Sequence, residues 1–192
     1  MIGNDIVDLK LASIQSNWKE KRILDKVFTK DEQELIFNAK TPFKMVWMLW
    51  SMKESTYKIY VQQTSKRFFN PKKLQCKLTS ETEGIVDVNE NRYITKTQIN
   101  IDFIYTIASL KEDKEILSTT FKFDDSSYPI QHKESHKKLI DAITKKQKLS
   151  SKDIYIKKNK VGVPKLFLNT KELKTSFSIS HHGHYGAYAI LN

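Results

Sequence analysis

The nine residues Trp50-Ser51-Met52-Lys53-Glu54-Ser55-Thr56-Tyr57-Lys58 decide the fold class, because they predict a helix with an apolar side and a charged edge. Glu54 and Lys58 are four residues apart, so on a helix they are neighbours one turn apart. Such a pair is usually solvated and contributes little to stability. The preceding residues are too apolar for a free helix surface: Met45, Trp47, Met48, Leu49. We therefore expect the pair of Glu54 and Lys58 at the edge of a buried helix face.

The start of the chain predicts a strand with a carboxylate on its apolar face. Over Met1–Leu9, strand alternation places Asp5 on the same side as Gly3, Val7 and Leu9. An unpaired charge on a buried face is strongly unfavourable. Asp5 therefore needs a cation or a hydrogen-bond donor close by.

A second predicted strand near the other end gathers hydroxyls and imidazoles. The segment Phe177-Ser178-Ile179-Ser180-His181-His182-Gly183 runs into a turn at a flexible glycine, and such a set suits a phosphate group. Asp5, Glu54, Lys58 and His181 together suggest a site for Mg²⁺ and a diphosphate, because Mg²⁺ is usually held by one or two carboxylates plus substrate phosphates.

A zinc site is less favoured by the sequence. Cys76 is the only cysteine, and no ligand spacing of histidine and cysteine accompanies it. The five histidines form no paired helical metal-binding motif either.

Five motifs of the chain resemble the signature of the 4′-phosphopantetheinyl transferase superfamily. Three are Gly3-Asn4-Asp5-Ile6-Val7, Trp50-Ser51-Met52-Lys53-Glu54-Ser55 with Lys58, and Ile179-Ser180-His181 with Gly183. Two more are Val27-Phe28-Thr29-Lys30-Asp31-Glu32, similar to a helix entry of the family, and Gly162-Val163-Pro164, similar to its Gly-Lys-Pro turn. The resemblance implies an α+β fold of two pseudo-symmetric halves, each a helix packed on a small antiparallel sheet.

The order of the motifs predicts a circular permutation. In the surfactin-synthetase-activating type of the family, the Gly-x-Pro turn and the Ile-Ser-His strand come first, whereas here they come last. Strand 177–191 should then lie beside the strand that begins at Met1, since close termini permit such a rearrangement. The alternative is a stretched relative of the short, trimeric holo-acyl-carrier-protein synthases, which share this motif order; the length of 192 residues argues against it.

We expect one compact unit of two halves. Residues 1–123 would carry the metal and catalytic motifs, and residues 124–192 the motifs that bind the coenzyme A phosphates. The length allows one or two domains. A loose internal repeat of helix and strands supports two halves, and Asp124–Pro129 is the expected connection.

The resemblance implies an enzyme that moves the 4′-phosphopantetheine arm of coenzyme A to a serine of an apo carrier protein, with Mg²⁺, and releases adenosine 3′,5′-bisphosphate. It assigns Mg²⁺ to Asp5 and Glu54, and catalysis to Glu54 and Lys58. Glu32 would orient Lys58. Coenzyme A would be bound by a further set: Lys53, Ser180, His181, Lys137 and Lys138.

Two departures from the family pattern bear on this assignment. Val7 stands where many relatives of the surfactin type have an acidic residue, which leaves two protein carboxylates for the metal. Val163 replaces the lysine of Gly-Lys-Pro and removes one phosphate contact, for which Lys160 or Lys165 could compensate.

The net charge of +11 favours polyanionic partners. Coenzyme A and an acidic carrier protein both qualify, and the carrier would belong to fatty-acid, polyketide or nonribosomal-peptide biosynthesis. The alternative is a non-catalytic basic module that binds nucleic acid or another phosphorylated partner, since basic clusters lie near aromatic residues. No recognisable nucleic-acid motif accompanies them. We expect a cytoplasmic protein, because no apolar run can span a bilayer and a single cysteine suits a reducing compartment. We also expect a monomer.

Overall fold

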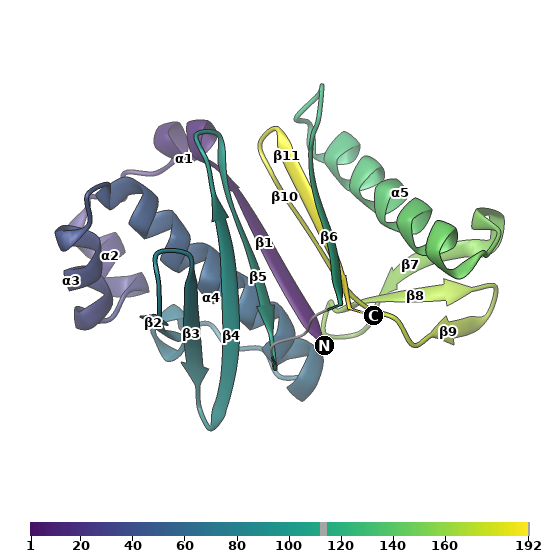
Figure 1. Ribbon diagram of the computed structural model, residues 1–192, viewed down its shortest axis with the longest axis horizontal. Coiled ribbons are helices and arrows are strands. Elements are labelled where there is room, and N and C mark those ends of the chain that lie inside the picture. The colour runs from purple at the N-terminus through teal and green to yellow at the C-terminus, as the bar shows by residue number, and fades with distance from the viewer. Residues whose placement is uncertain (112–114, 192) are drawn as a thin grey trace.

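The computed structural model describes residues 1–111 and 115–191, and it confirms an α+β fold of helices and antiparallel sheets. Figure 1 shows two blocks side by side, one built around helix α4 and the other around helix α5. Among the described residues, no helix has the length and apolar character needed to cross a membrane.

The first block is a five-stranded antiparallel sheet with helices on one side. Its strands lie in the order β1 (Ile2–Asp8), β5 (Phe103–Ser109), β4 (Asn91–Ile99), β3 (Glu83–Val88) and β2 (Gln75–Leu78). Its helices are α1 (Leu9–Gln15), α2 (Lys21–Val27), α3 (Lys30–Asn38), α4 (Pro42–Thr64) and the short η1 (Pro71–Lys73).

The second block contains two three-stranded sheets and one long helix. One sheet has the order β10 (Ser176–His182), β11 (Tyr185–Leu191) and β6 (Ile116–Lys122). The other has the order β7 (Ile154–Lys158), β8 (Pro164–Leu168) and β9 (Lys171–Leu173). Helix α5 (Tyr128–Gln147) packs against β10, β11 and β7, and η2 (Ser151–Asp153) follows it.

Local sequence explains where the two long helices begin and end. Pro42 and Pro129 lie in the first turns of α4 and α5, where a missing N–H costs nothing. Ser65 and Lys148 end the helices in the left-handed conformation. Each helix then buries an apolar face in its own core.

The two blocks repeat one order of elements. In each block, the strand that precedes the long helix pairs with the last strand of the block. That last strand also pairs with the strand that comes before it in the chain. The resulting orders are β1–β5–β4 and β6–β11–β10. The blocks differ in the strands between. β2 and β3 extend the first sheet, whereas β7, β8 and β9 form a separate sheet.

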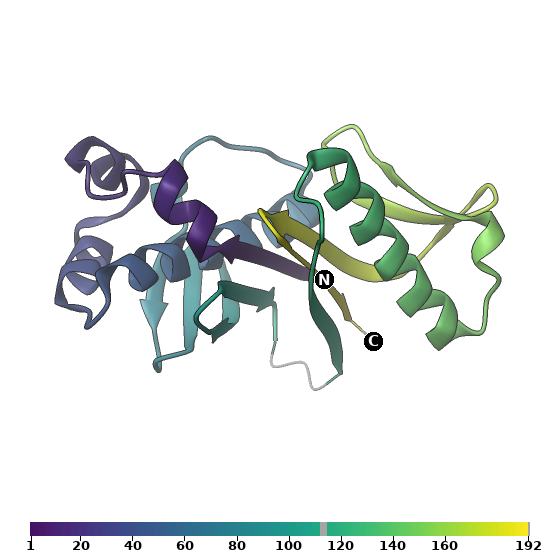
Figure 2. The same ribbon diagram turned by 90° about the horizontal axis from the view of Figure 1, so that it is seen from above.

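The edge of β1 that β5 leaves free faces β10, as Figures 1 and 2 show. The backbone N–H of Asn4 donates to Ser178 Oγ at 3.0 Å, and that of Asp8 donates to His182 Nδ1 at 3.0 Å. Side chains of the second block thus satisfy the backbone of the first. Segment 177–191 lies beside β1 as the sequence predicted, but it forms two strands, β10 and β11, rather than one. The permutation itself stays a prediction.

Candidate active site

Gly3 lets helix α4 approach strand β1 closely. A Cβ at this position would overlap the backbone oxygen of Ser55 on α4. Because the helix comes so near, Lys58 Nζ reaches Asn4 O at 2.6 Å and Asp5 Oδ1 at 3.4 Å. The odd-numbered face of β1, which carries Asp5, therefore meets the helix face that carries Lys58.

Asp5, Glu54 and Lys58 form one electrostatic cluster. Burial raises the pKa of Asp5, and Lys58 opposes this shift. Burial and the neighbouring charge of Asp5 raise the pKa of Glu54 to about 7, again against the effect of Lys58. One ammonium therefore does not compensate two desolvated carboxylates, and a second cation would lower both pKa values.

The donor set fits Mg²⁺ with two protein carboxylates. Within residues 1–111 and 115–191, no group of three or more metal-ligating side chains occurs. Two carboxylates with waters and substrate phosphates are a usual Mg²⁺ environment. Val7 is 3% exposed and offers no third oxygen.

Asp8 is engaged elsewhere. Its Oδ1 accepts from Leu11 N–H and caps α1, and its Oδ2 accepts from His184 N–H at 2.9 Å. Gly183 belongs to the same contact, because its φ is +58° and a Cβ there would overlap the Asp8 carboxylate. Asp8 thus fixes the β10–β11 turn against β1.

A cavity of about 230 Å³ opens between α4, α5, β10 and the turn that joins β7 to β8. Its lining contains three permanent cations and three imidazoles and no carboxylate: Lys58, Arg67, Lys158, His132, His136 and His181. Such a lining suits an anion with several phosphate groups.

The imidazoles lie close together. The rings of His132 and His136 are 4.0 Å apart between centroids, and Tyr128 contacts His181 edge-on at 5.6 Å. Burial, followed by the charges of His132, Lys158 and His181, lowers the pKa of His136 to about 4. Burial and Lys58 also lower the pKa of His181. A bound phosphate would raise both values, because it supplies the missing negative charge.

The β7–β8 turn brings a cation into the cavity wall. Gly162 has a φ of +80°, and the Arg67 guanidinium packs where a Cβ would be. Arg67 Nε donates to Val161 O at 2.8 Å. Val163, where the family pattern has lysine, is 8% exposed and packs into the core of the first block. Arg67, rather than a residue of the turn, supplies the positive charge there.

Comparison with known families decides the identity of this arrangement. The family model described as "4'-phosphopantetheinyl transferase superfamily" matches residues 1–114, more than half of the 192-residue chain. The chain belongs to the 4′-phosphopantetheinyl transferase superfamily. Its family places it among the transferases that use coenzyme A and a carrier protein.

Solved structures also resemble the chain. One is the holo-[acyl-carrier-protein] synthase of Thermotoga maritima, with 11% sequence identity and a TM-score of 0.45, over 85% of this chain and 80% of that one. No curated protein matches the chain.

The structure brings together some of the residues that the superfamily motifs predict. Asp5 and Glu54 lie beside Lys58, and Lys58 and His181 line the cavity. Ser180 lies on the opposite face of β10 from His181, is 6% exposed and is not part of the cavity lining.

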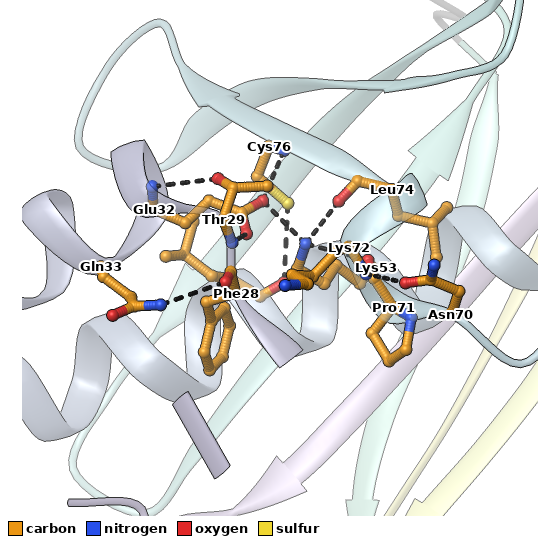
Figure 3. A network of polar contacts seen from close by, with 11 residues as sticks. Phe28, Thr29, Glu32, Gln33, Lys53, Asn70, Pro71, Lys72, Leu74 and Cys76 are labelled. Atoms are coloured by element: carbon orange, nitrogen blue, oxygen red, sulfur yellow. Dashed lines mark hydrogen bonds and ion pairs between the residues drawn. The ribbon is translucent and has the colours of Figure 1, made fainter. Parts of the chain in front are cut away.

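Three predicted lysines lie elsewhere. Lys137 and Lys138 are exposed on α5 outside the cavity lining, and Lys138 Nζ lies 5.1 Å from the ring centroid of Phe121. Lys53 is 1% exposed and binds Glu32 at 2.7 Å (Figure 3). The expectation that Glu32 orients Lys58 is corrected by this pairing.

Sequence reasoning undervalued four cavity residues: His132, His136, Arg67 and Lys158. Tyr128, His132 and His136 follow one another at intervals of four, which places them on one face of a helix. That spacing was the available signal for the α5 side of the cavity. Arg67 and Lys158 gave none, because only the fold brings the segment after α4 and strand β7 together.

Proposed function

We propose that this protein transfers the 4′-phosphopantetheine arm of coenzyme A to a serine of an acidic apo carrier protein, with Mg²⁺, and releases adenosine 3′,5′-bisphosphate. One observation carries the proposal: Lys58 belongs both to the carboxylate cluster with Asp5 and to a cationic cavity without carboxylates. The cluster suits the reacting diphosphate, and the cavity suits the phosphates of the nucleotide.

The carboxylates would hold the metal. Asp5 and Glu54 are the ligands that the described residues offer to Mg²⁺ beside the cavity. When bound, Mg²⁺ would neutralise the charge that develops on the diphosphate oxygens. Lys58 would bind the same diphosphate from the cavity side and stabilise the leaving phosphate.

Glu54 is the candidate general base. Without metal its pKa is about 7, and a bound Mg²⁺ would lower it, so Glu54 would be ionised at neutral pH and able to accept a proton. The serine oxygen forms a bond to the phosphorus that carries the pantetheine arm, and its proton passes to Glu54. The bond from that phosphorus to the bridging oxygen breaks, and adenosine 3′,5′-bisphosphate leaves with the electron pair.

The cavity would bind the nucleotide end of coenzyme A. The residues that would bind it line the cavity from four elements: His181 from β10, Lys58 from α4, His132 and His136 from α5, and Lys158 from β7. We leave Lys53, Lys137, Lys138 and Ser180 out of this binding set, because none of them belongs to the cavity lining.

We also propose that the chain is a two-half enzyme of the surfactin-synthetase-activating type in permuted order. The repeated arrangements β1–β5–β4 and β6–β11–β10 support two related halves within one chain. β6 precedes residue 124 and yet pairs with β11. We therefore place the division between β5 and β6, rather than after residue 123.

The test is incubation with coenzyme A, Mg²⁺ and a panel of apo carrier proteins of fatty-acid, polyketide and nonribosomal-peptide types, read by intact mass. We expect at least one carrier to gain a single phosphopantetheine arm, and the same carrier with its acceptor serine changed to alanine to gain none. Coenzyme A binding without modification of any carrier would contradict the proposal and favour a non-catalytic phosphate-binding module.

A further inference from the structure

Lys53 lies one residue before Glu54 on α4, yet its ammonium points into a closed polar network (Figure 3). The side chain is 1% exposed. It donates to Glu32 Oε1 at 2.7 Å, to Pro71 O at 3.1 Å and to Leu74 O. An ammonium has three protons, so its donors are fully used.

Glu32 is the other centre of this network. Its carboxylate, also 1% exposed, accepts from Lys53 and from the Cys76 N–H at 2.8 Å through Oε1. Its Oε2 accepts from Thr29 N–H at 2.8 Å and completes a capping box at the start of α3. The hydrogen bond from the Cys76 N–H to Glu32 therefore uses a backbone donor of the edge strand β2.

The network fastens α4 on the side away from the cavity. It joins α4 to the start of α3 and to the segment from η1 to β2. On the other side, Lys58 binds the backbone of β1 at Asn4. A helix held at both Lys53 and Lys58 has little freedom to slide or rotate, so the direction of Glu54 between them is fixed.

Stability alone gives a poor reason for this ion pair. Replacing a buried ion pair by uncharged groups of similar size is often neutral for stability, whereas removing one charged partner is strongly destabilising. We propose that Lys53 and Glu32 are positioning residues, which hold α4 so that Glu54 and Lys58 face Asp5. The inference rests on the proposed function, because it assigns the network a role in the same reaction.

The double variant Lys53→Met/Glu32→Gln tests this role. Both changes keep the volume, and the amide oxygen that replaces the Glu32 carboxylate can still accept from Thr29 N–H or Cys76 N–H. We expect a folded protein whose kcat per folded molecule falls by about 10- to 100-fold, since small misplacements of catalytic groups cost that much. The KM for coenzyme A should change by less than about threefold, because no residue of the network belongs to the cavity lining.

Glu32→Gln alone is a second variant, which keeps the shape and the acceptor oxygen but leaves the Lys53 ammonium without its charged partner, so it should lower the melting temperature more than the double variant does. It should lower kcat in the same direction with an unchanged KM. Lys53→Arg keeps the charge and should retain more of the parent kcat than the double variant. Val86→Ala in β3 is the control: it opens a cavity at a fully buried site without touching the network, so it should lower the melting temperature and leave kcat per folded molecule unchanged.

Mn²⁺ binding, measured by electron paramagnetic resonance, gives a readout without turnover. We expect weaker Mn²⁺ binding in the double variant and in Glu32→Gln, and unchanged binding in Val86→Ala. Parent values of kcat and Mn²⁺ affinity in both network variants, or an equal loss in Val86→Ala, would overturn the positioning role. A parent protein that modifies no carrier would contradict the proposed function instead, and the Mn²⁺ comparison would still test the positioning role.

Discussion

Lys53 and Lys58 lie five residues apart on one helix, but their side chains lie in different environments. Lys53 is 1% exposed and its donors are all used by protein acceptors. Lys58 has a side chain 30% exposed, and it lines a cavity beside two carboxylates with raised pKa values. A saturated network favours rigidity, whereas an incompletely compensated cluster favours a ligand. The contrast separates the residue that we propose to hold α4 from the residue that we propose to act on substrate.

The largest expected effect comes from the carboxylate cluster. Glu54→Gln and Asp5→Asn should each abolish detectable transfer, because each removes a negative charge that would bind Mg²⁺. Glu54→Gln also removes the proposed base. Neither should lower the melting temperature, since each removes a desolvated charge. Intact-mass assays and thermal melts check both outcomes. Near-parent turnover of either variant at low Mg²⁺ would show that its carboxylate has no role in the reaction.

Lys58→Ala should be next in size. We expect kcat to fall by about 10²- to 10³-fold, because Lys58 would stabilise charge that develops in the transition state. The KM for the carrier protein should change little. Steady-state kinetics with both substrates varied separately checks this split. A large rise in KM with an unchanged kcat would mean that Lys58 binds the ground state and the transition state equally and does not act in the chemical step.

The imidazole pair should make coenzyme A binding depend on pH. Phosphate binding raises the pKa of His136 from about 4, so binding takes up a proton and the affinity should rise as pH falls from 7 toward 5. The rise is limited to about tenfold per pH unit for one proton. Calorimetry in two buffers of different ionisation enthalpy measures the uptake.

The double variant His132→Gln/His136→Gln is the matched control for that experiment. It should bind coenzyme A with an affinity that depends less on pH, and without the proton uptake. Equal proton uptake in the parent and in this variant would exclude the pair from the phosphate site.

The smallest expected effect concerns stability. The folded-state pKa of Glu54, about 7, exceeds the ordinary value of 4.5, so the folded protein binds more protons between these values. The contribution of Glu54 to stability is therefore present below pH 4.5 and lost as pH rises through 7. We expect a loss of about 1–3 kcal/mol relative to Glu54→Gln across this window. Urea unfolding of both proteins at pH 5 and pH 7.5, without metal, measures the difference.

Sequence patterns predicted the metal-side cluster better than the coenzyme side. Asp5 followed from strand alternation, and Glu54 with Lys58 from the helical interval of four residues. Adjacent helix residues differ by about 100° in direction, so Lys53 and Glu54 cannot share a face. The family motif joined the two residues, and only the fold shows that they point to different partners.

The coenzyme side depends on contacts between distant segments. Adjacent strand residues point to opposite faces, which separates Ser180 from His181. Arg67 reaches the cavity only because it packs on Gly162, a residue of another block. Val163 is buried in the core of the first block, which no local pattern indicates. Such contacts have no sequence period, so sequence reasoning could not place these residues.

The most direct test of the account is a comparison of initial transfer rates for the parent, Glu54→Gln and Val86→Ala with one responsive carrier protein. The rates are measured by intact mass with saturating coenzyme A and Mg²⁺, and each is divided by the folded fraction. We predict parent-like transfer by Val86→Ala and none by Glu54→Gln. Parent-like transfer by Glu54→Gln would contradict the claim that the reaction takes place at the cluster of Asp5, Glu54 and Lys58.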